Sequence, residues 1–212
     1  MFKFEKDMIP VLEKGLSDIY KTDHILSEFN SGHGIADLVL GLSIKEWKEL
    51  LLDYENIYWV LKYINRRNKI VDLNKIVKTS TLKKGKLSWI FSLLVQNGIL
   101  EKVSDNTFLI LDKYSPPVEK IVSIEAKLSD WKWWLIQALR YKLYSHQSYL
   151  AISKEFSHRV DIKLLKEYNI WLIEVDLEGI KIIFRPKNEI PGNKTAYSYL
   201  SEKFYHTINN AY

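Results

Sequence analysis

Cysteine is absent from this sequence, which excludes disulfide bonds and thiolate metal ligands. No apolar run approaches the roughly 20 residues that a membrane-spanning helix needs, so we expect no membrane partner. The N-terminal stretch MFKFEKDMIPVLEKG carries charges throughout and no apolar segment, so we expect no secretory signal. Together these absences predict a protein of a reducing compartment, with the cytoplasm as the expected location.

Glycine-rich phosphate motifs are missing as well. The chain has no GxGxxG and no GxxxxGKS, so a nucleotide cofactor is not expected. The sequence does hold enough apolar residues for a core, since 47% of its 212 residues are hydrophobic and 27% are charged. A formal charge of +5 is mildly basic, which permits a nucleic-acid partner without requiring one.

The pattern of expected secondary structure changes at Ser43 and again after the Ser-Pro-Pro at 115–117. Outside these points we predict an α/β core made of residues 1–42 and 116–212, with a central mixed β-sheet flanked by helices. The elements expected in it are a helix at 5–20, a hairpin of strands at 24–29 and 35–42, a strand at 121–128, a helix at 130–145, a strand at 148–153, a short helix at 160–169 and a hairpin at 170–186.

Residues 43–115 have the element order of an inserted winged helix-turn-helix module. Ser43 and Glu46 form a capping-box pattern, which predicts a helix from there to about residue 65. Asp72 is placed to cap a second helix, and Gly98 is placed to end a third. A hairpin at 99–112 would then be the wing, and the following prolines mark the return to the core.

Positive charge is concentrated inside this module. The cations between positions 66 and 86 are Arg66, Arg67, Lys69, Lys75, Lys78, Lys83, Lys84 and Lys86. Asp72 is the only acid there, so eight minus one gives +7, and the rest of the chain carries −2. This pattern predicts contact with nucleic-acid phosphates, while a solvated face of a protein-binding domain is the alternative. We expect Trp89 in the core of the module.

Two charged residues stand inside the apolar stretch at 121–128. Glu125 and Lys127 are two positions apart, so they share one face of a strand. Charges there are costly unless they are paired or bind a metal, and a salt bridge between them is the simple explanation. Asp37 is another lone carboxylate in a predicted strand. Two converging carboxylates repel each other unless a cation lies between them, and oxygen ligands suit Mg²⁺ or Mn²⁺.

The helix predicted after this strand adds two polar residues. Gln137 and Tyr141 lie four positions apart, so they occupy one face of that helix. Both side chains can lean toward the strand end that carries the charged pair. An ordinary surface glutamine and a half-buried tyrosine are the alternative.

A family resemblance rests on these residues in this order: Asp37, Glu125, Ala126, Lys127, Gln137 and Tyr141. They resemble the D…E-x-K…Q-x-x-x-Y motif set of the PD-(D/E)xK nuclease superfamily, in its RecB-like branch. The elements predicted in 5–40 and 118–155 are also similar in order to the restriction-endonuclease-like core of that superfamily. Ala36 stands where the family name has proline, and the inserted module lengthens the usual connection after Asp37.

The resemblance implies a Mg²⁺- or Mn²⁺-dependent deoxyribonuclease that acts on DNA. Asp37, Glu125 and the backbone carbonyl of Ala126 would bind the metal. Lys127, with a pKa depressed beside that metal, would orient or deprotonate the attacking water or stabilise the phosphate. The glutamine and tyrosine of the helix would position the phosphate or the water.

Members of the family often have a further acidic ligand from the first helix or strand, and Glu13 and Glu28 are the candidates here. Two other functions stay open. The chain can be a non-catalytic DNA-binding regulator on a nuclease-like scaffold. It can also be a protein-interaction module, with the winged helix as a homodimer surface.

Overall fold

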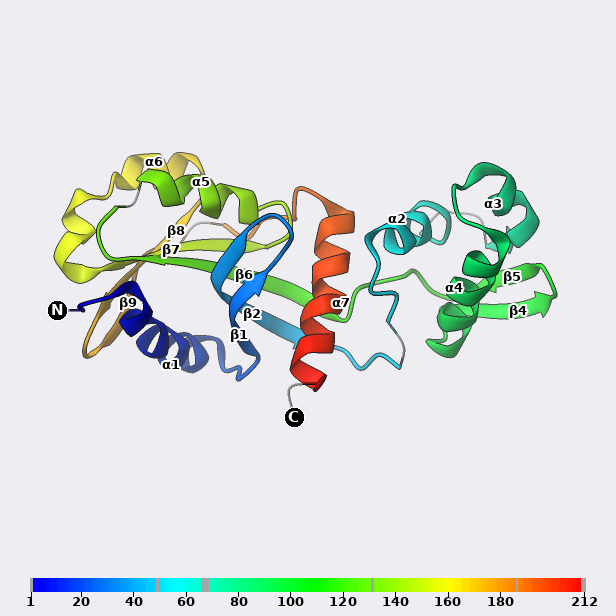
Figure 1. Ribbon diagram of the computed structural model, residues 1–212, viewed down its shortest axis with the longest axis horizontal. Helices are drawn as coiled ribbons and strands as arrows, with labels where there is room; N and C mark the ends of the chain where they lie inside the picture. Colours follow the sequence, from blue (N-terminus) through cyan, green and yellow to red (C-terminus); the bar gives the residue numbers. More distant parts are fainter. Residues whose placement is uncertain (1, 49, 66–68, 131, 186, 211–212) are drawn as a thin grey trace.

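Six strands form one mixed sheet in the larger part of the molecule (Figure 1). In spatial order they are β1 (Ile25–Asn30), β2 (Ile35–Ile44), β6 (Val118–Lys127), β7 (Gln147–Ser153), β8 (Trp171–Asp176) and β9 (Gly179–Phe184). The β6–β7 and β7–β8 pairs are parallel, and the other neighbours are antiparallel. The computed structural model describes residues 2–48, 50–65, 69–130, 132–185 and 187–210. It confirms the predicted α/β class with a mixed sheet between helices.

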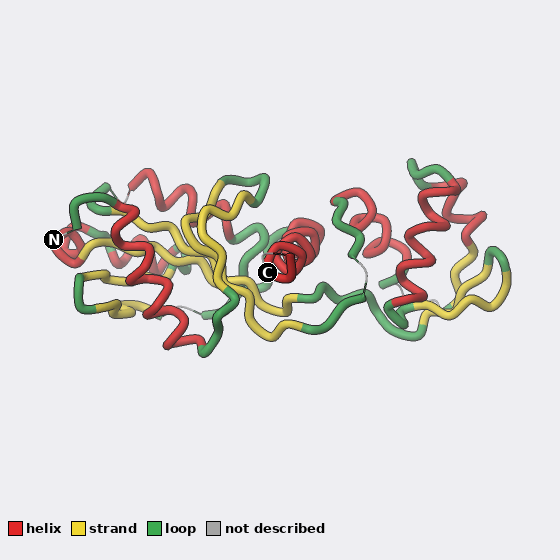
Figure 2. Tube along the Cα trace, turned by 60° about the horizontal axis from the view of Figure 1, so that its bottom comes forward, coloured by secondary structure: helices red, strands yellow, loops and turns green. Residues whose placement is uncertain are grey.

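Helices cover both faces of this sheet (Figure 2). One face packs against α1 (Ile9–Tyr20), which follows the short 3-10 helix η1 (Glu5–Met8). The other face is covered by α5 (Lys132–Tyr141), α6 (Ile162–Glu167) and α7 (Lys194–Asn210), and η2 (Lys154–Arg159) follows β7. Among the described residues, no helix has both the length and the apolarity that crossing a membrane requires.

Side chains along the strands point alternately toward the two helix layers. Along β6, Val122 and Ile124 pack toward α1, while Ser123, Glu125 and Lys127 fall on the opposite face. All five are buried. The charged pair therefore lies on the side of the sheet that α5 covers.

The segment between β2 and β6 folds around a core of its own (Figure 1). Its elements are α2 (Tyr54–Tyr63), β3 (Ile70–Asp72), α3 (Leu73–Thr79), α4 (Lys84–Gln96), β4 (Leu100–Ser104) and β5 (Thr107–Ile110). The strands form a small antiparallel sheet in the order β3-β5-β4. The predicted cap at Asp72 is confirmed, because its side chain accepts from two amides of α3, and Gly98 follows α4 with a positive φ of 70°.

The predicted capping box at Ser43 and Glu46 is wrong. Strand β2 continues to Ile44, and Ser43 adopts a positive φ of 57°. The helix begins instead at Tyr54, where Asp53 accepts hydrogen bonds from two backbone amides. Pairing of β2 with β6 continues to the end of the strand, so tertiary pairing overrides the local helix signal.

Helix α7, which the sequence analysis does not predict, lies between the two parts of the chain (Figures 1 and 2). Its Glu202 is fully buried. One carboxylate oxygen accepts from the amides of Leu51 and Leu52 at 2.7 and 2.8 Å, and the other accepts from the Tyr114 hydroxyl at 2.7 Å. Glu202 therefore joins α7 to both the entering and the leaving connection of the inserted segment.

Candidate active site

Asp37 and Glu125 face each other across the β2–β6 pair. The register pairs Leu38 with Ile124, so the next residues along the two antiparallel strands are Asp37 and Glu125. Directly opposed side chains on one face have Cβ atoms about 4.5–5.5 Å apart. Asp37 Oδ2 also accepts from the Ala126 amide at 2.7 Å, which holds the carboxylate at the end of the strand pair.

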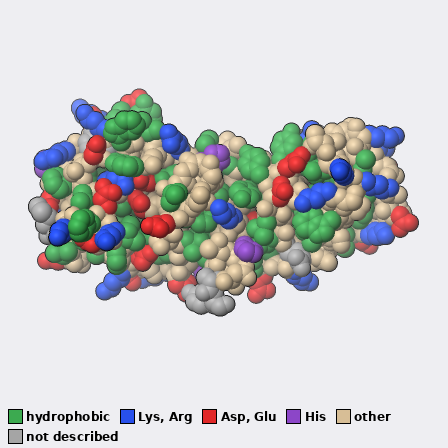
Figure 3. Space-filling view, in the orientation of Figure 1, with side chains coloured by type: hydrophobic (Ala, Val, Ile, Leu, Met, Phe, Trp, Pro, Cys, Tyr) green, Lys and Arg blue, Asp and Glu red, His purple; other side chains and the backbone are tan. Residues whose placement is uncertain are grey.

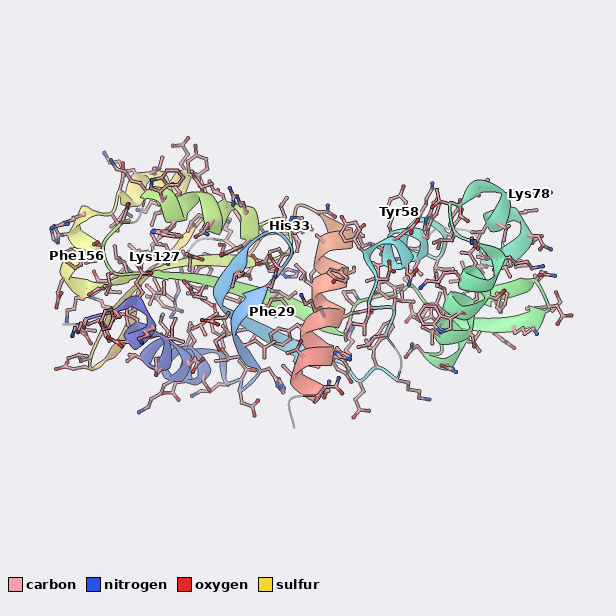
Figure 4. The ribbon with its side chains drawn as sticks, viewed as in Figure 1. Phe29, His33, Tyr58, Lys78, Lys127 and Phe156 are labelled. Carbon is pink, nitrogen blue, oxygen red and sulfur yellow. The ribbon has the colours of Figure 1, made fainter. Side chains whose placement is uncertain are left out.

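Lys127 places its ammonium group between these carboxylates. Its Nζ lies 3.4 Å from Glu125 Oε1 and 3.8 Å from Asp37 Oδ2. The side chain is only 7% exposed, and the ring of Trp134 on α5 covers it with its centroid 3.8 Å from Nζ. Figure 4 shows Lys127 within the sheet-bearing part of the molecule, well apart from the inserted module. The structure thus brings the three charged residues of the predicted motif together.

The acid nearest to Lys127 is one that the sequence analysis does not select. Glu5, the first residue of η1, accepts from Lys127 Nζ at 2.8 Å through its Oε2 atom. Glu28 lies between the Ser27–Leu38 and Phe29–Ala36 pairs of β1 and β2, close enough for its negative charge to raise the pKa of Asp37. Glu13, on α1, makes no hydrogen bond or ion pair with these groups in the described part of the chain.

Tyr141 reaches Glu125 from α5. Its hydroxyl lies 2.6 Å from Glu125 Oε2 and 2.8 Å from the Ile35 carbonyl, so one proton is shared between two acceptors. Gln137 lies one turn earlier on the same helix, and its buried Oε1 has no hydrogen-bond partner among the described residues. The tyrosine therefore contacts the motif directly, whereas the Gln137 carbonyl oxygen makes no hydrogen bond to the charged residues that the structure describes.

Burial raises the pKa of Glu125 to about 7, and the negative charge of Asp37 adds to this effect. The hydrogen bond from Tyr141 and the charge of Lys127 act in the opposite direction. Burial also raises the pKa of Asp37, against the hydrogen bond from the Ala126 amide and the charge of Lys127. The two carboxylates thus share a site in which both negative charges are costly, and a cation relieves that cost.

Lys127 itself remains a cation. Burial lowers its pKa, but the hydrogen bond to Glu5 and the charges of Asp37 and Glu125 outweigh burial and raise the pKa. A depressed pKa, as predicted beside a metal, is therefore not what the protein side chains alone produce. An ammonium that keeps its proton suits the stabilisation of negative charge better than the removal of a proton from water.

The donor set fits a hard divalent cation that keeps much of its water shell. Mg²⁺ is commonly held by one or two carboxylates together with waters, and Asp37 and Glu125 supply two. No group of three or more His, Cys, Asp or Glu side chains suited to a metal occurs in the described ranges. Water and the predicted Ala126 carbonyl would have to complete the coordination.

Comparisons of the chain with family models, with curated proteins and with solved structures found no match. The arguments about function therefore rest on the geometry of the chain itself.

The cations predicted to contact phosphates lie on the surface of the inserted module. Those that the structure describes are exposed: Lys69, Lys75, Lys78, Lys83, Lys84 and Lys86. Arg66 and Arg67 fall outside the described residues. The N-cap position and first turn of α4 carry three of these lysines, and α3 carries two. Figure 3 shows lysine side chains spread over the module at the right.

Trp89 does not belong to the core of the module, contrary to the sequence expectation. It is 43% exposed on α4, and Lys86 Nζ lies 4.6 Å from its ring centroid. Helix α4 turns Leu87 and Ile90 toward the interior, which leaves Trp89 on the outer face.

Proposed function

We propose that this chain is a metal-dependent nuclease of the PD-(D/E)xK type, which hydrolyses phosphodiester bonds of DNA. The observation that carries the proposal is the cluster of Asp37, Glu125 and Lys127 on paired strands, with the Tyr141 hydroxyl bound to Glu125. The mixed sheet between helices supports it, since it presents these groups from adjacent strands.

Each side chain has a role that follows from its contacts. Asp37 and Glu125 would hold Mg²⁺ or Mn²⁺, which supplies Lewis-acid activation of the phosphodiester and its attacking water when bound. Lys127, as an ammonium, would stabilise the charge that develops on the phosphate. Tyr141 keeps the Glu125 carboxylate in one orientation. The vacant Gln137 Oε1 would accept a hydrogen bond from a water near the phosphate.

The inserted segment would bind the nucleic acid. We propose that it is a winged helix-turn-helix, with α4 as the helix that approaches the major groove and β4–β5 as the wing. The order helix, strand, two helices and hairpin, together with the exposed lysines at the start of α4, supports this assignment.

The test combines metal binding with cleavage. Mn²⁺ is titrated calorimetrically into the wild type, Asp37→Asn and Asp18→Asn, where Asp18 is an exposed aspartate of α1 and serves as the matched control. The same proteins are incubated with circular and linear DNA. We expect binding and cleavage to be lost in Asp37→Asn and retained in Asp18→Asn. Equal behaviour of the two variants would remove Asp37 from the site.

One observation favours a second function, a DNA-binding regulator without catalysis. Lys127 lies within ion-pair distance of the carboxylates of Glu5, Asp37 and Glu125, so its positive charge offsets part of their repulsion without a metal. A wild-type protein that binds no Mn²⁺ yet shifts DNA in a gel would favour this alternative. A protein that binds neither would favour the third possibility, a protein-interaction module.

A further inference from the structure

Helix α2 carries a stripe of aromatic and basic residues on its outer face. Tyr54, Tyr58 and Lys62 recur at every fourth position, so they line up along one side of the helix. Tyr54 is 42% exposed and Tyr58 is 45% exposed. The packing of the module turns Ile57 and Val60 inward and leaves Tyr58 open, whereas the Tyr54 hydroxyl accepts a hydrogen bond from Asn193 at 3.2 Å.

The stripe is held in place by contacts of its own. Lys62 Nζ lies 4.4 Å from the ring centroid of Trp59 and 5.7 Å from those of Tyr58 and Tyr63. Trp59 and Tyr63 stack nearly parallel, with centroids 5.5 Å apart and planes 9° apart. The Tyr63 hydroxyl is bonded to the Thr79 hydroxyl at 2.6 Å, which ties α2 to α3. These contacts hold Lys62 beside the exposed ring of Tyr58 and over the buried ring of Trp59, so the surface is preorganised.

This surface connects the core with the basic helices. At one end, the ring of Tyr54 lies 6.1 Å from that of Tyr199 on α7. At the other end lies α3 with its exposed lysines, and in Figure 4 Tyr58 and Lys78 both project along the upper edge of the module. The nearby acid Glu55 accepts from Thr81 at 2.6 Å, so its carboxylate is engaged toward the start of α4.

We propose that the Tyr54–Tyr58–Lys62 stripe binds an unpaired, single-stranded segment of nucleic acid by stacking of its bases. Exposed rings with a cation at one end of the row suit a strand whose bases are open on both faces and whose phosphates lie nearby. Bases within a duplex are already stacked on each other and offer no free face to a tyrosine. The inference rests on the proposed function, because it extends the nucleic-acid contact of the inserted segment to the part next to the core.

The experiment measures fluorescence anisotropy of labelled oligonucleotides in EDTA, so that no cleavage occurs. The probes are a dT 20-mer, an rU 20-mer and a blunt hairpin duplex, and the proteins are the wild type, Tyr58→Ala, Tyr58→Phe and Lys78→Ala. We expect Tyr58→Ala to weaken single-strand binding about tenfold and to leave duplex binding within about twofold, since stacking on an aromatic ring contributes on this scale. Tyr58→Phe keeps the ring and should retain single-strand binding, whereas Lys78→Ala should weaken duplex binding.

The remaining outcomes separate this inference from the function beneath it. Unchanged single-strand binding by Tyr58→Ala, an equal loss on single strand and duplex, or no wild-type binding of either 20-mer would each overturn the stacking surface. A thermal melt of Tyr58→Ala that matches the wild type excludes a folding defect, and Tyr58→Phe provides the same check independently. The nuclease proposal fails in a different way. In that case the wild-type protein binds single strands and Tyr58→Ala weakens this binding, but the wild type neither binds Mn²⁺ nor cleaves DNA. Tighter binding of dT than rU, or the reverse, tells whether DNA or RNA is the preferred strand.

Discussion

Glu202 allows a direct test of how the core and the inserted segment are joined. Its carboxylate is fully buried and takes three hydrogen bonds, and no ion pair involves it in the described part of the chain. Burial raises the pKa of Glu202 to about 7, although the hydrogen bonds from Leu52, Tyr114 and Leu51 act in the opposite direction. Between pH 4.5 and about 7, Glu202 therefore holds its proton in the folded protein and loses it in the unfolded chain.

The size of the effect follows from linkage between protonation and folding. An acid with a higher pKa in the folded than in the unfolded state binds its proton more tightly when folded. The stability from Glu202 is then fully present below about pH 4.5 and is lost as the pH rises toward 7. A difference between 4.5 and about 7, at about 1.4 kcal/mol for each tenfold change, corresponds to a loss of about 3 kcal/mol.

Glu202→Gln should remove this pH dependence. The glutamine oxygen can still accept from the amides of Leu51 and Leu52, and the Tyr114 hydroxyl can turn to accept from the new amide group. We expect urea unfolding at pH 8 to show a variant that is more stable than the wild type by up to about 3 kcal/mol. At pH 4.5 the two proteins should differ little. Stability curves that run parallel from pH 4.5 to 8 would refute the reasoning.

Other groups with a shifted pKa must be separated from Glu202, chiefly Glu125 and His146. Glu125 also has a pKa raised to about 7, so Glu125→Gln is measured alongside and combined with Glu202→Gln. Burial lowers the pKa of His146 to about 4, which has the opposite sign, because that contribution is lost as the pH falls below 6.5. Since His146 is common to all variants, its effect cancels in the differences between them.

Three further predictions concern the site, the basic surface and the packing of the sheet. Tyr141→Phe removes the donor to Glu125 and should weaken Mn²⁺ binding about tenfold in calorimetry, because a hydrogen bond to a charged group contributes roughly 1.5–3 kcal/mol; unchanged affinity would contradict a role in holding the carboxylate. Lys78→Gln should lower the slope of log K against log salt by about 0.9 for duplex DNA, and an unchanged slope would remove Lys78 from the interface. Gly41→Ala should cost about 1–3 kcal/mol in urea unfolding, because the added Cβ would clash with the Phe204 ring of α7. Gly85→Ala meets open space and should stabilise by about 0.5–1 kcal/mol, and equal effects of the two substitutions would refute the packing argument.

Local sequence patterns are sufficient to predict most strands of the core sheet. Alternating apolar residues and glycine turns predict the β1–β2 and β8–β9 hairpins, and the isolated charges on β6 indicate that Glu125 and Lys127 act as a pair. The spacing of Gln137 and Tyr141 also predicts that Tyr141 leans toward Glu125. The structure contains this contact, because α5 directly follows β6 and packs against it. Short connections leave few arrangements for neighbouring elements.

The structural features that the sequence patterns do not predict depend on contacts between distant parts of the chain. Glu5 reaches Lys127 from the far end of the sequence, and nothing in the local pattern around it predicts where η1 lies on the sheet. Ser43 has a helix-capping pattern, yet Val118 continues the strand pairing past it. Helix α7 did leave a readable signal in residues four apart, such as Leu200 and Phe204, but polar residues dominate its sequence.

The inserted segment also has a consequence for the order in which the chain folds. Ile44 at the end of β2 pairs with Val118 at the start of β6, and the Lys45 amide is bonded to the Pro117 carbonyl at 2.8 Å. While residues 45–117 are unstructured, this pairing must close a long flexible loop, and the entropic cost of closure grows with loop length.

Folding of the insert first removes most of that cost. Leu51 and Tyr114, near its two ends, are buried in the same hydrophobic core, so a folded insert holds its own ends together. The β2–β6 pairing, which assembles Asp37 with Glu125, then closes only a short connection. We therefore expect mutations in the core of the insert to slow the formation of the candidate active site, which stopped-flow refolding would measure, although the residues they change belong to another core.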